Sequence, residues 1–359
     1  MNSNELPTPC LVLDLDRFES NLDRMNRVAR EAGVALRPHA KTHKCVHIAR
    51  RQIELGAIGI CTATIAEAEV LAAAGIRGLL ITAEMVGEPK VSRFIKVLKA
   101  APDTMVVVDD PLNVAELQSA AHKAGVEATI LIDLDIGQNR TGVQPGEAAR
   151  NLAAAIERCG NLKLAGICAY AGHLAHVHGF EARKAASRAA WAVALETRGL
   201  LIRDGHDMRI VSGASTGTHN IDSEIPGVTE LQAGSYVFMD VEYGGIGGVD
   251  FKPALFVLST VVHRSGSKAI VDAGLKAFAT DRPFGPQPFA MPGITYEFAG
   301  DEHGRLTLDD AAGLPLGSRL RFILPHCDPN VNLYDRIHCL RGDDVVDVWP
   351  IMDRSGGYF

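Results

Sequence analysis

The segment RPHAKTHK, residues 37–44, is the first in this chain whose residue types could do chemistry. It places Lys41 among two histidines, an arginine and a second lysine. Desolvation and neighbouring cations lower the pKa of a lysine, and such an amine can form a Schiff base with a carbonyl compound. A basic loop ahead of a helix, with its lysines in water, would have the same composition. Lys41 is therefore a candidate nucleophile, with a solvated loop as the alternative.

Two later segments contain an arginine and a group of histidines. Arg140 follows a glycine-containing turn in DLDIGQNRTG, residues 133–142, where its guanidinium could offer two fixed donors to a phenolate or a carboxylate. In YAGHLAHVH, residues 170–178, three histidines, among them His176, are spaced closely enough for acid–base chemistry or metal ligation. The plainer alternatives are a surface loop with a capping aspartate and structural histidines.

Two segments rich in glycine and hydroxyl residues, 212–218 (SGASTGT) and 233–236 (AGSY), could bind phosphate. Small residues leave backbone N–H groups accessible, and these groups can cradle a phosphate. Each segment alone is weak evidence, and the two support each other. The candidate phosphate-binding residues are Ser215, Thr216, Gly217, Thr218, Gly234, Ser235 and Tyr236.

The segment PHCDPN, residues 325–330, contains a candidate metal site. In an extended chain His326 and Asp328 point to the same side, while Cys327 points to the other. One nitrogen and one oxygen ligand suit Mn²⁺, Mg²⁺ or Zn²⁺, and two protein ligands leave room for water and substrate. The alternative is an Asp-Pro turn beside a histidine. The charged turn at 301–304 (DEHG) is equally ambiguous.

The elements that must position these residues alternate along the first two thirds of the chain. Short apolar runs are each followed by an amphipathic, alanine-rich stretch, which predicts βαβ units in a parallel sheet. Eight such runs are the number expected for a (β/α)8 barrel, whose active site lies at the C-terminal ends of its strands. A doubly wound open sheet is the rival, but nothing marks its switch point. The runs are Ala35–Ala40, Ala57–Ala63, Gly78–Thr82, Met105–Asp109, Thr129–Asp135, Leu164–Ala171, Met208–Ser212 and Glu230–Tyr236.

After Asp240 the pattern changes to strand-like segments separated by turn residues, with no good helix. The early run Cys10–Leu15 precedes the first helix and would be a ninth parallel strand, so we expect it in the C-terminal sheet. The prediction is an α/β chain with a TIM-type barrel over 16–240 and a mainly antiparallel β domain from 1–15 and 241–359. The six predicted strands of this domain are Leu255–His263, Lys268–Asp272, Thr295–Phe298, Leu306–Leu308, Arg319–Leu324 and Asp344–Trp349.

Length and composition exclude several classes. A chain of 359 residues exceeds one ordinary core unless that core is a barrel. The net charge of −7 argues against nucleic acid or an anionic membrane as partner. No secretory signal or long apolar run is present. The seven cysteines are scattered and form no C-x-x-C pair, which favours reduced thiols in a cytoplasm.

Taken together, these segments resemble the family of D-threonine aldolases and D-serine dehydratases, whose N-terminal domain is similar to that of alanine racemase. The resemblance covers essentially the whole chain and implies a pyridoxal 5′-phosphate (PLP) enzyme of fold type III. The segments that carry it are Thr8–Asp14, Arg37–Lys44, Leu231–Asp240, Val271–Lys276, Asp301–Gly304 and His326–Pro329.

The resemblance also implies residue roles. Lys41 would form the Schiff base with PLP, Arg140 would contact the 3′-oxygen of the cofactor, and Tyr170 would lie close to its ring. The segments 215–218 and 234–236 would hold the phosphate. His326 and Asp328 would bind a divalent metal, and His176 would act with that metal on the substrate hydroxyl. Relatives of this kind are commonly homodimers.

Within the family the metal motif separates two activities. Aldolase-type members have His-x-Asp followed by proline, as at 326–329 here, whereas dehydratase-type members have His-x-Cys. We therefore expect a lyase that cleaves D-threonine, D-3-hydroxyaspartate or a similar D-β-hydroxy-α-amino acid to glycine and an aldehyde. A dehydratase giving a 2-oxo acid and ammonia is the alternative.

Two further alternatives have less support. A non-catalytic PLP carrier would resemble the barrel but would lack the β domain and its His-x-Asp pair. A racemase needs a second base, a tyrosine from the C-terminal domain, and no matching motif is present. Tyr243 and Tyr334 have no assigned role.

Overall fold

The computed structural model describes residues 1–308 and 314–354 and divides the chain into two compact units. The barrel unit comprises residues 25–41 and 46–234, and the sheet unit comprises residues 1–24, 42–45 and 235–354. The boundary falls inside helix α1 (Leu15–Ala32). The predicted β domain includes residues 309–313 and 355–359, which lie outside the described residues.

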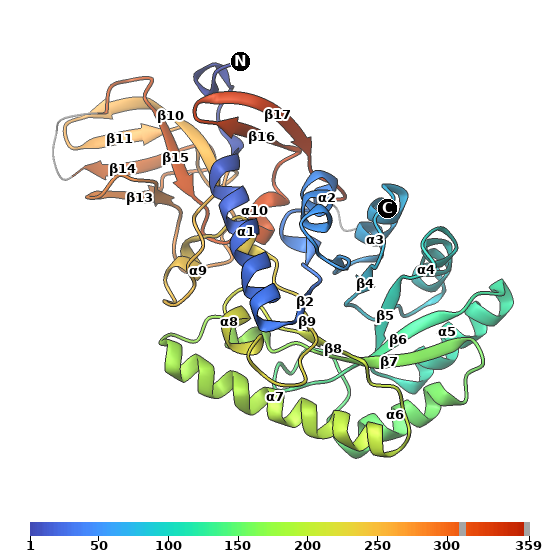
Figure 1. Ribbon diagram of the computed structural model, residues 1–359. Coiled ribbons are helices and arrows are strands. Elements are labelled where there is room, and N and C mark those ends of the chain that lie inside the picture. The colour runs from blue at the N-terminus through green and yellow to red at the C-terminus, as the bar shows by residue number, and fades with distance from the viewer. Residues whose placement is uncertain (309–313, 355–359) are drawn as a thin grey trace. The chain divides into compact units, whose positions relative to one another are not determined.

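The barrel unit contains eight parallel strands in the order β2-β9-β8-β7-β6-β5-β4-β3 (Figure 1). A parallel bridge between His39 and Cys61 joins the two ends of this order and closes the barrel. Each strand overlaps one of the eight predicted runs, so the predicted (β/α)8 barrel is confirmed. The strands are β2 (Ala35–Leu36), β3 (Cys61–Thr62), β4 (Leu80–Ile81), β5 (Met105–Val108), β6 (Ala128–Asp133), β7 (Leu162–Ala169), β8 (Ile210–Gly213) and β9 (Glu230–Leu231).

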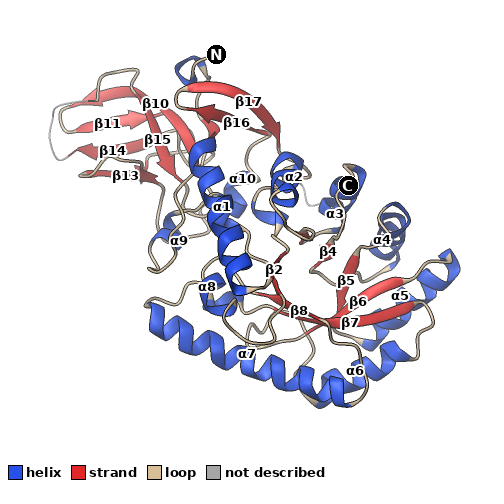
Figure 2. Ribbon diagram, viewed as in Figure 1, coloured by secondary structure: helices blue, strands red, loops and turns tan. Residues whose placement is uncertain are grey.

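The helices of this unit lie outside its strands (Figure 2). Sequence signals set their ends. Helix α5 begins at Pro111 behind the capping carboxylate of Asp110, and it ends at Gly125 in the left-handed conformation. The helices are α2 (Val46–Glu54), α3 (Ile65–Ala73), α4 (Glu88–Ala100), α5 (Pro111–Ala124), α6 (Glu147–Glu157), α7 (Phe180–Arg203) and α8 (His219–Asp222), with the short 3-10 helix η3 (Gly172–Leu174).

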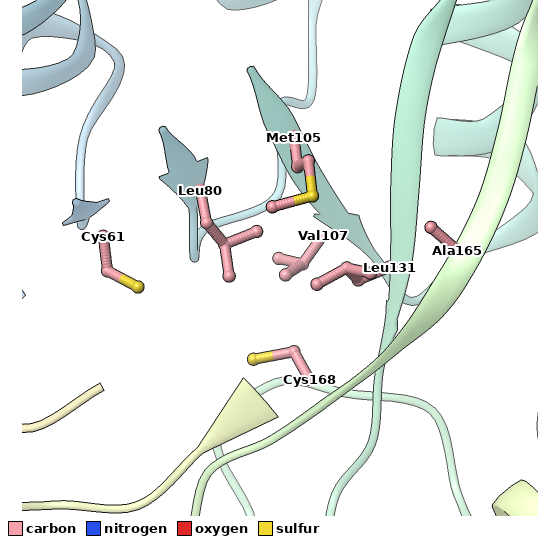
Figure 3. Close-up of a cluster of buried hydrophobic side chains, with 7 residues drawn as sticks. All are labelled: Cys61, Leu80, Met105, Val107, Leu131, Ala165 and Cys168. Atoms are coloured by element: carbon pink, nitrogen blue, oxygen red, sulfur yellow. The ribbon is translucent and has the colours of Figure 1, made fainter. Parts of the chain in front are cut away.

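The interior of the barrel is filled by side chains that alternate along the strands. Met105 and Val107 of β5, two residues apart, point to the same side as Leu80 and Leu131 (Figure 3). The cluster is completed by Cys61, Ala165 and Cys168. This packed core leaves the ends of the strands as the places where the barrel unit can present polar side chains.

The sheet unit is a nine-stranded sheet in which every strand pair is antiparallel except β1–β16 (Figure 1). The long strand β10 pairs with β1, β11 and β15. The mainly antiparallel sheet predicted from the sequence is confirmed. Its strands are β1 (Cys10–Asp14), β10 (Leu255–Ser265), β11 (Lys268–Val271), β12 (Gln287–Pro288), β13 (Ile294–Phe298), β14 (Gly304–Leu308), β15 (Arg319–Ile323), β16 (Arg336–Arg341) and β17 (Asp344–Pro350).

Short helices also occur in the sheet unit. The sequence predicted no good helix after Asp240, but α9 (Val241–Gly244) and α10 (Cys327–Val331) each form about one turn. The 3-10 helices are η1 (Ser3–Glu5) and η4 (Ser235–Val237), and η2 (Ala40–Thr42) spans a boundary between the units. None of the helices in residues 1–308 and 314–354 has the length and apolar character needed to cross a membrane.

The charged turn at 301–304 is structural. Lys276 donates its backbone N–H to the carbonyl of Asp301, and its ammonium contacts Glu302 at 2.5 Å. A Cβ on Gly274 would meet the backbone nitrogen of His303 at 2.4 Å, so only glycine permits this approach. Residues 271–276 and 301–304, two of the segments that carry the family resemblance, therefore hold two loops of the sheet unit together.

Candidate active site

A buried ion pair fixes the start of the segment that carries Lys41. Arg37, which directly follows β2, donates from Nε and Nη2 to the two carboxylate oxygens of Glu230 on β9, at 2.9 and 2.7 Å. Its Nη1 also donates to the carbonyl of Gly78, and both ionic side chains are only 6% exposed. Burial acts to lower the pKa of Arg37, but the hydrogen bonds and charge of Glu230 raise it instead. Glu230 therefore balances the positive charge of Arg37, and the pair joins β9 to the residue that follows β2.

Lys41 lies in the loop after β2, and a hydrogen bond to its backbone N–H fixes its main chain. Its N–H lies 3.3 Å from Nδ1 of His39, which must accept this hydrogen bond. Nε2 of His39 then carries the proton and donates to Oγ1 of Thr82 at 3.0 Å, while Thr82 donates to the carbonyl of Thr62. In this tautomer His39 is neutral and positions the main chain of Lys41.

The last two basic residues of the segment lie in the sheet unit. Nζ of Lys44 donates to the backbone carbonyl of Asp353 at 2.9 Å, and Nδ1 of His43 accepts the N–H of Cys45 at 3.0 Å. Each of the four basic residues that surround Lys41 in the sequence therefore has a partner of its own. Three of them have structural hydrogen bonds of their own, and Arg37 is paired with a carboxylate.

Arg140 and Tyr170 come together from the loops that follow β6 and β7. The guanidinium carbon of Arg140 lies 5.7 Å from the centroid of the Tyr170 ring, a cation–π arrangement. Asp135 builds the arginine loop, because its Oδ1 accepts the N–H groups of Gly137 and Asn139 at 3.0 Å each. A Cβ on Gly172 would meet the Tyr170 ring at 2.5 Å, so glycine is required beside this ring.

The three histidines of residues 170–178 have different surroundings. His173 is exposed, and its backbone N–H donates to Oε1 of Gln138 at 2.7 Å, which ties the loop after β7 to the loop after β6. His176 is partly exposed and follows Ala175, whose carbonyl lies against Gly217. No group of three or more metal-type side chains occurs within the described ranges, so the three histidines do not form a metal cluster.

The loop 215–218 after β8 is held from behind by a buried carboxylate. Thr218 donates from Oγ1 to Oδ2 of Asp222 at 2.5 Å, and Ser187 donates to the other oxygen. Ser215 reaches Thr218 through its N–H at 3.2 Å and through its hydroxyl at 3.1 Å. Burial raises the pKa of Asp222 to about 6, although the hydrogen bonds act to lower it.

The same loop packs tightly against its surroundings. A Cβ on Gly217 would stand 1.9 Å from the carbonyl oxygen of Ala175. The buried Arg183 of α7 donates from Nε to the carbonyl of Gly217 and from Nη1 to that of Val177, both at 2.8 Å. Neither Asp222 nor Arg183 was found from the sequence. Both are buried charged residues on helices beside the loop. Their burial depends on the packing of the fold, so no local sequence pattern marks them.

Carboxylates follow three successive barrel strands, at the end that also carries Arg140. Asp133 closes β6 and accepts the hydroxyl of Thr141 at 2.9 Å, and Asp109 accepts the N–H of Gly142 at 2.9 Å. Burial raises the pKa of Asp133, and the neighbouring carboxylate of Glu84 raises it further. Burial likewise raises the pKa of Glu84. These acids could have been found from the sequence, because the active site of a barrel lies at the C-terminal ends of its strands.

The remaining predicted phosphate residues lie at the unit boundary. Gly234 ends the barrel unit, and Ser235 and Tyr236 begin helix η4 of the sheet unit. The carbonyl of Ser235 accepts the N–H groups of Phe238 and Met239. Tyr236 is fully buried, with its ring 5.6 Å from that of Phe251, so its ring serves the core of the sheet unit.

The candidate metal pair lies at the start of a helix, so the prediction of an extended chain at 326–328 is wrong. His326 is the N-cap of α10, with extended backbone angles, and Asp328 lies in its first turn. Asp240 anchors this start: its Oδ2 accepts the N–H of Cys327 at 3.0 Å, and its Oδ1 accepts that of Tyr243 at 2.9 Å. Nδ1 of His326 lies 2.7 Å from Oδ2 of Asp281, a residue that no sequence motif marked.

The two tyrosines without a role are both in the sheet unit. Tyr334 donates its hydroxyl to the carbonyl of Ala277 at 2.8 Å, and burial raises its pKa well above the ordinary value. Tyr243 is buried in α9. A tyrosine whose proton is held by a carbonyl is poorly placed to serve as the second base of a racemase.

Comparison with known proteins gives a consistent result along the chain. Residues 13–242 match the family model of the alanine racemase N-terminal domain, and residues 254–340 match a putative serine dehydratase domain. The chain is 37% identical to a 3-hydroxy-D-aspartate aldolase of Paracoccus denitrificans, with 100% of this chain and 95% of that protein covered. It is 39% identical to a D-threonine aldolase of an Arthrobacter species (97% and 93% covered). A D-threo-3-hydroxyaspartate dehydratase of Delftia sp. HT23 is 32% identical (96% and 97%).

Solved structures agree. A crystal structure of D-threonine aldolase from Filomicrobium marinum has a TM-score of 0.96 at 39% identity, covering 99% of this chain and 97% of that one. A D-threo-3-hydroxyaspartate dehydratase in a metal-free form, with a cysteine replaced by alanine, has a TM-score of 0.88 at 30% identity (98% and 99% covered). The resemblance drawn from the sequence is confirmed, and the chain belongs to the PLP-dependent family that has the alanine racemase N-terminal domain.

Proposed function

We propose that this protein is a PLP- and divalent-metal-dependent lyase that cleaves D-β-hydroxy-α-amino acids to glycine and an aldehyde. D-Threonine and D-3-hydroxyaspartate are the proposed substrates. The observation that carries the proposal is the full-length similarity, at 37 and 39% identity, to two proteins named as aldolases of these D-amino acids. The side chains described above supply the chemistry that such a reaction needs.

The donor set of the barrel unit fits PLP. Lys41 supplies a primary amine for the cofactor's aldehyde, and Arg140 supplies a fixed cation for an anionic oxygen. Ser215, Thr216, Gly217 and Thr218 form a loop of small residues that Asp222 holds in place through the Thr218 hydroxyl, which suits a phosphate bound by backbone N–H groups. Gly234, at the end of the barrel unit, belongs to the same proposal, as do Ser235 and Tyr236, which follow it in the chain and begin the sheet unit; their proposed contribution is made by the backbone. Tyr170 supplies an aromatic face next to Arg140.

The donor set of the sheet unit fits a divalent cation. His326 offers an imidazole nitrogen, and Asp328 offers a carboxylate two residues later. Mn²⁺, Mg²⁺ and Zn²⁺ all accept this pair of ligands. A carboxylate already holds the other nitrogen of His326, as second-shell groups commonly do in metal sites.

The reaction moves one proton from the β-hydroxyl and breaks one carbon–carbon bond. Bound PLP would draw the electrons of the broken Cα–Cβ bond away from Cα, and a bound cation would lower the pKa of the substrate hydroxyl. His176 is the proposed base that takes the hydroxyl proton. The aldehyde then leaves, and a proton returned to Cα completes glycine. Lys41 would hold the cofactor until the substrate amine takes its place, and Arg140 would keep the cofactor oriented during the reaction.

A dehydratase is the second candidate, because the 32% identical Delftia protein acts on a D-β-hydroxy amino acid in a different way. In that reaction Lys41 would remove the Cα proton and the hydroxyl would leave from Cβ. The metal motif favours the aldolase. A D-threo-3-hydroxyaspartate dehydratase has been solved in a metal-free form as a variant with a cysteine replaced by alanine, whereas this chain has a carboxylate, Asp328, two residues after His326.

The product mixture from D-threonine separates the two candidates. We expect glycine and acetaldehyde in equal amounts, with no turnover of L-threonine as the stereochemical control. Predominant 2-oxobutanoate and ammonia would replace the aldolase by the dehydratase. A protein that shows the absorbance of bound PLP but converts neither D-threonine nor D-3-hydroxyaspartate would instead be a cofactor carrier.

Two accompanying properties belong to the proposal. We propose a homodimer, which light scattering on the purified protein tests directly. We also propose a cytoplasmic protein, because all seven cysteines lie within the described residues and none is in a disulfide.

A further inference from the structure

A chain of charged side chains leads away from the imidazole of His326. Nδ1 of His326 lies 2.7 Å from Oδ2 of Asp281, and Nη1 of Arg282 lies 3.1 Å from the same oxygen. Nε of Arg282 in turn lies 2.8 Å from Oε2 of Glu242. All four residues belong to the sheet unit and are at most about one third exposed. The contacts therefore form one continuous network.

This network determines which nitrogen of His326 is available. An ionised carboxylate can only accept hydrogen bonds, so the ring proton of neutral His326 must be on Nδ1, facing Asp281. The lone pair is then on Nε2, the nitrogen that could bind a cation. Arg282 contacts the same oxygen of Asp281 and holds this carboxylate in place, and Glu242 holds Arg282 in turn.

The backbone of His326 is fixed separately from its ring. Asn330 donates from Nδ2 to the carbonyl of His326 at 2.6 Å, and the next residue, Cys327, donates its N–H to the buried Asp240. A histidine whose main chain is fixed at a helix start can still rotate its ring. Asp281 is the group that removes this freedom.

We propose that Asp281 is a positioning residue, which holds His326 in the tautomer and ring orientation needed to bind a divalent metal through Nε2, with Arg282 supporting it. This inference rests on the proposed function only in taking His326 as a metal ligand. It adds a third and a fourth residue, from a loop more than forty positions earlier in the chain, to a site predicted from two neighbours.

Mn²⁺ binding to the PLP-loaded, EDTA-treated and desalted protein tests the proposal without using activity. Free Mn²⁺ is followed by its EPR signal during titration. Loss of an outer-sphere partner typically weakens metal affinity about 10- to 100-fold, and we expect a loss of this size for Asp281→Ala. Asp281→Asn keeps an acceptor for the Nδ1 proton and should recover part of the affinity. Arg282→Met should lose less than Asp281→Ala.

The matched control is Asp250→Ala, which removes an exposed aspartate that pairs with Arg24 at 2.8 Å in the same unit. It should bind Mn²⁺ as the wild type does. Equal affinity in the wild type and both Asp281 variants would overturn the positioning role while leaving the metal site intact. Absence of Mn²⁺ binding in the wild type would instead overturn the metal part of the proposed function. If Asp281→Ala does not fold, the Asp281→Asn and Arg282→Met titrations decide.

Discussion

The barrel unit and the sheet unit carry their candidate residues in opposite ways. In the barrel unit Lys41, Arg140 and Thr218 come from loops after three different strands, and each loop has a supporting hydrogen bond between residues at most four positions apart. In the sheet unit His326 and Asp328 are two residues apart at the start of one helix, and their support comes from Asp240 and Asp281, far away in the sequence.

The difference shows what limits each site. The barrel positions its residues by topology, so the loss of one supporting contact should weaken one loop. The sheet unit positions its pair through long-range carboxylates, so the loss of one carboxylate should disturb a ligand that is otherwise unchanged. Variants in the two units should therefore separate cofactor binding from metal binding.

The largest expected effect follows the removal of the amine in the barrel unit. Lys41→Ala should abolish the absorbance band of lysine-bound PLP and lower kcat roughly 10³-fold or more, because the proposed covalent anchor of the cofactor is removed. Mn²⁺ binding should remain. Lys44→Met, the neighbouring lysine whose ammonium contacts a backbone carbonyl, should keep the band. A normal band in Lys41→Ala would contradict the assignment.

The next largest effect concerns the stability of the barrel. Glu230→Gln leaves the buried Arg37 without its counter-charge, and breaking such a pair typically costs about 3–5 kcal/mol of unfolding free energy. Urea unfolding followed by circular dichroism measures it. The control is Arg150→Met, which breaks an exposed pair with Asp204 and should cost much less. Similar losses in the two variants would mean that burial adds nothing here.

A pH effect of intermediate size is expected from Asp222. Its pKa is raised from 3.8 to about 6 in the folded protein, so its stabilising contribution is complete below pH 4 and is lost as pH rises through 6. This difference corresponds to about 3 kcal/mol. Asp222→Asn does not titrate, so its unfolding free energy should fall less between pH 4 and pH 7.5 than that of the wild type. Parallel pH profiles would show that Asp222 titrates normally.

The smallest of these effects is the one most specific to the sheet unit. Asp328→Ala removes one of two proposed protein ligands and should weaken Mn²⁺ binding by roughly 10²-fold, equivalent to about 2.7 kcal/mol. The PLP absorbance band should be unchanged, in contrast to Lys41→Ala. Loss of both PLP and metal in Asp328→Ala would remove the distinction between the two units.

The sequence predicted the elements better than the contacts. Eight runs of apolar residues located all the barrel strands, because periodicity and strand count depend on local composition. Strand β16 was missed although Ile337, Cys339 and Leu340 are buried, since exposed arginines at both ends hide the apolar pattern. The metal segment was assigned an extended form, but Asp240 binds the N–H of Cys327 and starts a helix. The sequence places Arg37 four residues before Lys41, but it does not reveal the partner of Arg37, because Glu230 is almost two hundred residues away.

The most direct test follows PLP absorbance and glycine formation from D-threonine together while Mn²⁺ is returned to the EDTA-treated enzyme. If the barrel unit holds PLP and the sheet unit holds the metal, the absorbance band is the same at every Mn²⁺ concentration. Glycine formation rises from near zero to a plateau as Mn²⁺ is added. A band that disappears with the metal, or glycine formation that is indifferent to EDTA, would contradict this division.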